Sequence, residues 1–197
     1  MNTLADFQNT ILTAAAIFVI LSAALWFIVP LTSGLPWVPA RAKRIRRALQ
    51  LAELRPGETL YDLGAGDGRV LVAAAREFGA RAVGIEISPI HCLTAILRAH
   101  LAGVGRQVSV RPGSFFHADL SGADVIYAYL TSRQAERLRP FLESQLRPGA
   151  RVVTISAEID GWQPEQIDRQ ELIFLYRMPP TPGSLASYLA RDIPEAD

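Results

Sequence analysis

The sequence predicts an α/β fold, a doubly wound and mostly parallel sheet, preceded by one N-terminal transmembrane helix. Short apolar runs alternate with segments of helical periodicity, and a glycine-rich loop joins the first run to the helix after it. A long uncharged segment near the N-terminus predicts the membrane helix. We therefore expect a membrane anchor over residues 1–35, an α/β domain over 36–180 and a C-terminal tail over 181–197.

The expected membrane span covers residues 11–31 and is apolar apart from Thr13 and Ser22. As a helix it would be about 31 Å long, which matches the hydrocarbon core of a bilayer. A cleaved signal peptide and a buried core helix remain as alternatives. A signal peptide normally starts with Lys or Arg, whereas Asp6 is the only charged side chain before Arg41. A small domain also encloses a helix that is apolar all round with difficulty.

A cluster of cations follows the apolar segment. It consists of Arg41, Lys43, Arg44, Arg46 and Arg47. The positive-inside rule therefore predicts a single-pass membrane protein with its N-terminus outside and the domain on the cytoplasmic side. The same cations could bind anionic lipid headgroups or simply form a solvated helix face.

The composition excludes several classes of function. The chain has 20 Lys and Arg against 19 Asp and Glu, a net charge of +1, so it lacks the overall basic charge of many nucleic-acid-binding proteins. The single cysteine, Cys92, excludes an internal disulfide and a multi-thiolate metal site. His91, His100 and His117 show no metal-ligand spacing, so we expect no metal. The balanced charge likewise leads us to expect no nucleic-acid partner.

Strands and helices alternate along the rest of the chain. The expected strands cover residues 59–63, 82–87, 108–111, 125–130, 151–157 and 172–177. The expected helices cover residues 41–54, 69–78, 89–102 and 133–146, and a proline-rich tail begins at Pro179. Strands separated by helices of this length form a parallel sheet that is covered on both faces.

The glycine-rich loop is the segment Tyr61-Asp62-Leu63-Gly64-Ala65-Gly66-Asp67-Gly68-Arg69. Open α/β sheets bind nucleotides at this point, and glycine lets a ligand approach the backbone closely. Two carboxylates, Asp62 and Asp67, would repel a pyrophosphate, so a cationic ligand fits better. S-adenosylmethionine carries a sulfonium and an amino group but no phosphate.

A second acidic position supports S-adenosylmethionine as the cofactor. Glu86 lies at the end of the second expected strand, 18 residues after Gly68. A carboxylate at this position can accept hydrogen bonds from both ribose hydroxyls. The loop, the acid and the strand spacing together predict a cofactor site.

The Asp-x-Gly-x-Gly-x-Gly motif resembles the main signature of the class I S-adenosylmethionine-dependent methyltransferases, whose fold is Rossmann-like. The resemblance implies that Asp62 or Asp67 faces the methionine amino group and Glu86 the ribose. It also implies that the loop and the residue after the acid contact the cofactor, namely Gly64, Ala65, Gly66, Gly68 and Ile87. Many relatives carry an acid after the third strand, where this chain has Ser114-Phe115-Phe116. Ser114 is then expected to bond the adenine and Phe115 to stack on it.

Two short elements narrow the resemblance. Pro36-Trp37-Val38-Pro39 precedes the domain, and Trp162-Gln163-Pro164 follows the fifth strand. With the N-terminal apolar segment, they resemble the protein-lysine methyltransferases that modify the ATP synthase c subunit and the adenine nucleotide translocase. This resemblance implies methylation of a lysine in a membrane-associated protein. Tyr129, at the end of the fourth strand, is expected to line the acceptor channel.

Two other functions remain open. A lipid or quinone-precursor methyltransferase would use the same anchor and cations equally well. A non-catalytic membrane protein could bind S-adenosylmethionine without transferring the methyl group. Transfer to protein, transfer to lipid, or binding without transfer distinguishes the three.

Overall fold

The structure is a computed structural model that describes residues 3–32 and 39–191. The motif residues 36–38 lie outside the described residues. The helices are α1 (Thr3–Thr32), α2 (Ala42–Leu51), α3 (Arg69–Phe78), α4 (Pro89–Leu101), α5 (Ser132–Gln145) and α6 (Leu185–Arg191), with a short 3₁₀ helix η1 (Phe115–His117). The strands are β1 (Thr59–Leu63), β2 (Arg81–Glu86), β3 (Val108–Pro112), β4 (Val125–Tyr129), β5 (Arg151–Ile155), β6 (Trp162–Gln163), β7 (Gln166–Asp168), β8 (Ile173–Arg177) and β9 (Thr181–Pro182).

The central sheet has seven strands in the order β3-β2-β1-β4-β5-β8-β7. Strands β1 to β5 are parallel, whereas β8 is antiparallel to both β5 and β7. The chain starts at β1, moves outward to β3 and returns to β4 beside β1. This reversal confirms the doubly wound, mostly parallel sheet and places the switch point between β1 and β4.

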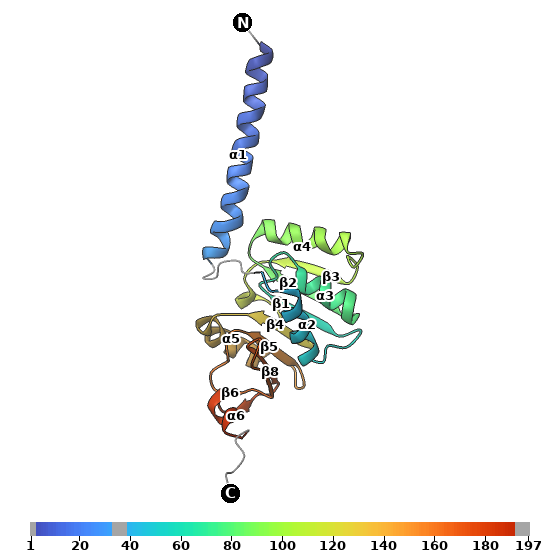
Figure 1. Ribbon diagram of the computed structural model, residues 1–197, viewed down its shortest axis with the longest axis vertical. Helices are drawn as coiled ribbons and strands as arrows, with labels where there is room; N and C mark the ends of the chain where they lie inside the picture. The colour runs from blue at the N-terminus through green and yellow to red at the C-terminus, as the bar shows by residue number, and fades with distance from the viewer. Residues whose placement is uncertain (1–2, 33–38, 192–197) are drawn as a thin grey trace.

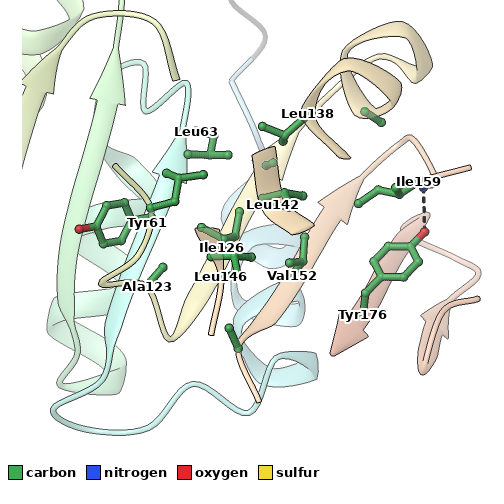
Figure 2. Close-up of a cluster of buried hydrophobic side chains, with 14 of the residues drawn as sticks. Tyr61, Leu63, Ala123, Ile126, Leu138, Leu142, Leu146, Val152, Ile159 and Tyr176 are labelled. Atoms are coloured by element: carbon green, nitrogen blue, oxygen red, sulfur yellow. Dashed lines mark hydrogen bonds between the residues drawn. The ribbon is translucent and has the colours of Figure 1, made fainter. Parts of the chain in front are cut away.

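Two apolar layers cover the sheet. Helices α2 and α3 bury their apolar residues on one face, and α4 lies beside α3 (Figure 1). Helix α5 covers the other face, where Leu138 and Leu142 pack with Ile126 and Val152 (Figure 2). Each of these leucines is fully buried, and truncation of such a side chain to alanine typically costs about 2–5 kcal/mol. The two layers fix the ends of the strands that carry the site.

Several boundaries differ from the sequence-based expectation. Strand β2 ends at Glu86, so Ile87 lies just beyond it. Strand β5 ends at Ile155 because Ser156 adopts a positive φ of 69°, which interrupts extended backbone. The expected tail after Pro179 contains β9, which pairs with β6, and α6. This pairing joins residues far apart in the sequence, so local patterns gave no sign of it.

Helix α1 stands away from the α/β domain (Figure 1). Its segment Asp6–Ala24 is long and apolar enough to cross a membrane, and no part of that segment is buried against the domain. The interpretation as a buried core helix is therefore wrong. Thr13 donates its hydroxyl to the carbonyl of Asn9 at 2.8 Å, so this polar group is satisfied within the helix.

The cations of α2 bind the domain. Arg46 pairs with Glu77 of α3, and Arg47 pairs with Asp168 of β7, each at 2.6 Å. Arg44 donates to the carbonyl oxygen of Glu171 at 2.6 and 2.9 Å. Most of the cluster that follows the apolar segment therefore fastens α2 to the domain, so neither lipid headgroups nor solvation alone accounts for these cations.

Candidate cofactor and acceptor site

A cavity of about 340 Å³ lies at the carboxyl ends of β1, β2 and β4, at the switch point of the sheet. Ten of the residues expected at the site line it. They are Asp62, Gly64, Ala65, Gly66, Asp67, Glu86, Ile87, Ser114, Phe115 and Tyr129. Gly68 does not line the cavity.

Gly68 allows two helices to approach each other. It adopts a φ of +78° at the start of α3, and a Cβ built on it would lie 2.7 Å from the Cβ of Ala95 in α4. Such a contact is too short for any larger side chain. Gly68 therefore holds α3 and α4 together behind the loop, which gives this glycine a packing role.

Glu86 fixes the glycine-rich loop. Its two carboxylate oxygens accept hydrogen bonds from the backbone N–H groups of Gly66 and Ser88, both at 2.8 Å. Burial opposes ionisation, but these bonds and the ring of His91 outweigh it and lower the pKa of Glu86. An ionised carboxylate has further lone pairs, so Glu86 can also accept ribose hydroxyls.

Asp67 is bound on both sides by arginine. Arg69 and Arg98 each donate to its carboxylate at 2.7 Å. Burial acts against ionisation, but the two guanidinium groups prevail and lower the pKa of Asp67. The carboxylate is therefore already neutralised, which makes it a poor partner for the amino group of a ligand.

Asp62 has the opposite environment. Asp62 is only 3% exposed. None of the residues that the structure describes donates a hydrogen bond to its carboxylate. Burial, followed by the charges of Glu86 and Asp67, raises its pKa well above the ordinary value. A bound ammonium group would favour the ionised form. Of the two acids expected to face the methionine amine, Asp62 is the one whose carboxylate is not already paired with arginine.

The third strand leads to an aromatic wall. Ser114 caps η1 by accepting the N–H of Phe116 at 3.4 Å. The rings of Phe115 and Phe116 lie 4.5 Å apart, and the guanidinium of Arg137 lies 4.4 Å from the centre of the Phe116 ring. All four residues line the cavity.

Tyr129 is held at the other wall by an arginine from α2. Arg44 donates to its hydroxyl at 3.2 Å, and the guanidinium lies 5.2 Å from the ring centre. The same guanidinium donates to Ser156 at 2.9 Å and to the carbonyl of Glu171. Ser156 and Glu171 therefore hold the Arg44 guanidinium in place, and Arg44 in turn fixes the position of the Tyr129 ring.

Several residues that line the cavity were not singled out from the sequence, among them Phe116, Tyr127, Gln134 and Arg137. Tyr127 lies two positions before Tyr129 and so on the same side of β4; this period of two could have indicated it. Within the described part of the chain its buried hydroxyl has no hydrogen-bond partner, and burial raises its pKa. Gln134 lies in the first turn of α5 and forms a capping box with Thr131, a pattern visible in the sequence.

The sheet order, the loop and the two carboxylates define a class I S-adenosylmethionine-dependent methyltransferase, and the residues present fit this cationic cofactor. The family model described as the ANTKMT methyltransferase domain matches residues 62–166, more than half of the chain. The chain belongs to this family.

Similar proteins agree with this assignment. A protein-lysine N-methyltransferase of Saccharolobus islandicus is 39% identical over 137 residues, which cover 69% of this chain and 85% of the relative. The adenine nucleotide translocase lysine N-methyltransferase of Mus musculus is 34% identical over 137 residues, and the match spans 59% of its length. A solved structure described as an RNA methyltransferase from Salinibacter ruber, in complex with S-adenosyl-L-homocysteine, superposes with a TM-score of 0.71 at 39% identity. That match covers 75% of this chain and 99% of the solved one.

Proposed function

We propose that this enzyme transfers a methyl group from S-adenosylmethionine to the side-chain amine of a lysine in a membrane-associated protein. The observation that carries the proposal is one cavity with two different walls. The carboxylates of Asp62 and Glu86 provide a cofactor side, and the rings of Phe116, Tyr127 and Tyr129 provide an aromatic side. The similarity to protein-lysine methyltransferases supports lysine as the acceptor.

The cofactor roles follow from the contacts of each residue. Asp62, buried and without a donor among the described residues, binds the methionine ammonium. Glu86 accepts the ribose hydroxyls while it holds the loop through Gly66. Ser114 and Phe115 contact the adenine from the end of β3. The glycines of the loop admit the cofactor close to the backbone.

The aromatic wall suits an amine acceptor. The cofactor supplies the activated methyl group, so the residues of the chain act mainly by positioning. A lysine ammonium, with an ordinary pKa of about 10.4, must lose a proton before its nitrogen can attack. A poorly solvated aromatic site favours the neutral amine, and aromatic faces then bind the methylated cation. Tyr129, fixed by Arg44, directs the acceptor.

The anchor supports a substrate in the same membrane. Segment Asp6–Ala24 is apolar and fully outside the domain. We propose that α1 spans the bilayer with its N-terminus outside and the domain on the cytoplasmic side. Confinement to one membrane raises the effective concentration of enzyme and substrate.

The experiment is incubation of native membranes with the enzyme and radiolabelled S-adenosylmethionine, followed by separate counting of protein, lipid and RNA fractions. An Asp62→Ala variant is the control. We expect label in a small protein band, lost in the variant, and methyl-lysine in its hydrolysate. Label in lipid would instead identify a lipid or quinone methyltransferase, and label in RNA would match the activity named for the Salinibacter protein. Cofactor binding without transfer would indicate a binding protein.

A further inference from the structure

Helix α4 is apolar on its outward face as well as on its buried face. Its buried side consists of His91, Cys92, Ala95 and Ala99. Its outward side carries an apolar stripe made of Leu93, Ile96, Leu97 and Leu101, which are 68%, 39%, 57% and 81% exposed. The spacing of three, four and eight residues places these side chains along one side of the helix. A continuous exposed stripe of this kind usually marks a binding surface.

No acidic side chain of α4 opposes contact with an anionic surface. The helix contains no acidic residue between Pro89 and Leu101. Arg98 in its last turn donates to the carboxylate and the carbonyl oxygen of Asp67, so this cation serves the loop and the apolar stripe provides the contact with lipid. Amphipathic helices at bilayer interfaces bury such an apolar face among the headgroups.

Helix α1 indicates what covers the stripe. It contacts α4 and leaves the domain on the side where α4 lies (Figure 1). No residue of its segment Asp6–Ala24 is buried by the domain, so insertion into lipid would bury it. Insertion of α1 would bring the adjacent apolar stripe to the same bilayer.

We propose that the apolar stripe of α4 lies in the interfacial layer of the bilayer that receives α1. The proposal rests on the proposed membrane function. The domain then has two attachments, a spanning helix and a surface helix, and its orientation on the membrane is fixed. Ile87 is 37% exposed, and both it and His91 line the cavity just before the stripe begins. The rim of the cavity therefore lies near the lipid headgroups, within reach of a lysine at the membrane surface.

The test measures contact with lipid at single positions of the full chain. The only cysteine, Cys92, is buried, so a Cys92→Ala parent accepts single labels. A fluorophore is attached at Leu97→Cys or, as a matched control on the opposite face of the sheet, at Ser144→Cys, whose hydroxyl donates to the Phe141 carbonyl in its own helix. Each protein is reconstituted into vesicles of phosphatidylcholine and phosphatidylglycerol that carry nitroxide-labelled lipid.

We expect the lipid nitroxide to quench the label at position 97 at least roughly twofold more than the label at position 144. Equal quenching overturns the proposal. Shielding of position 97 from aqueous iodide without quenching by lipid also overturns it, because a protein partner would then cover the stripe. Quenching requires no methyl transfer, so its failure is distinct from failure of the proposed activity.

A second variant tests the stripe in a chain that keeps Cys92. Leu93→Ser, Leu97→Ser and Leu101→Ser together remove the apolar side chains but lie outside the cavity lining. We expect unchanged cofactor affinity and roughly fivefold less methylation of the substrate in membranes, because one of the two attachments is lost. Unchanged methylation of the membrane substrate overturns the proposal.

Discussion

Asp62 and Asp67 show at the scale of single residues how two carboxylates in one loop acquire different properties. Asp67 is neutralised by Arg69 and Arg98, whereas Asp62 is buried without a donor among the described residues. The Asp67 carboxylate therefore contributes to the stability of the loop. The Asp62 carboxylate is suited to bind a cation.

Substitution of each acid by its amide separates the two roles. We expect Asp62→Asn to weaken S-adenosylmethionine binding roughly 10- to 100-fold, because a charged hydrogen bond to the ammonium is lost. The same variant should raise the stability of the unliganded protein at neutral pH, because burial disfavours the ionised carboxylate and the amide carries no charge. Asp67→Asn should instead lower stability, because the two guanidinium groups lose the negative charge that they pair with. Calorimetry and thermal unfolding measure both; destabilisation by Asp62→Asn would contradict this account.

The opposite pKa shifts of Asp62 and Asp67 make the stability of the protein and its affinity for the cofactor depend on pH. The folded-state pKa of Asp62 is raised, so its favourable contribution is complete below the ordinary value of 3.8 and is lost as pH rises through the folded pKa. The folded-state pKa of Asp67 is lowered, so its contribution is present above 3.8 and is lost as pH falls. Cofactor affinity should rise with pH as Asp62 ionises, and the Asp62→Asn variant should lack this dependence.

Arg44 holds Tyr129, a side chain that lines the cavity. We expect Arg44→Ala to lose about 1–3 kcal/mol of stability, because several hydrogen bonds of a charged donor disappear. KM for the protein substrate should rise while cofactor affinity stays unchanged, since Tyr129 loses its fixed position. Arg46→Ala is the matched control: the same helix loses the same charge, but its partner Glu77 lies away from the cavity. Equal effects of the two variants on KM would refute a positioning role for Arg44.

At the scale of elements, the contact between α3 and α4 depends on one glycine. Gly68→Ala introduces a Cβ at 2.7 Å from Ala95 and a strained positive φ, so we expect a loss of about 2–4 kcal/mol. Gly57→Ala has a similar φ of +82° but nothing within 4 Å, so it should cost only about 1–2 kcal/mol. Chemical denaturation of both variants checks the difference. Similar losses of stability in the two variants would mean that backbone strain, and not the contact with Ala95, causes the destabilisation.

For the whole molecule, removal of the N-terminal apolar segment tests how the domain is attached to the membrane. We expect a chain that begins at Pro36 to leave membranes in high salt while it still binds S-adenosylmethionine, because it lacks Asp6–Ala24, the segment that is long and apolar enough to cross a membrane. The stripe of α4 alone gives only weak, reversible binding. Sedimentation with membranes and calorimetry give the two results. A shortened chain that stays fully membrane-bound would show that α1 is not the anchor.

The sheet class, and the position of the glycine-rich loop and Glu86 at the cavity, could be predicted from the sequence, because they depend on local periodicity and on glycines at fixed spacing. The apolar character of α1 could be predicted in the same way. Which acid remains available to a ligand depends on the folded structure, because Asp67 is neutralised in part by Arg98, which is distant in the sequence. The sequence left the cations of α2 open to lipid headgroups or to solvent, whereas in the folded structure Arg44 donates to Tyr129 and Arg47 pairs with Asp168 of β7. The folded structure likewise pairs β9 with β6. The physical reason is the same in each case: charge pairing and strand pairing join residues whose spacing in the sequence carries no local signal.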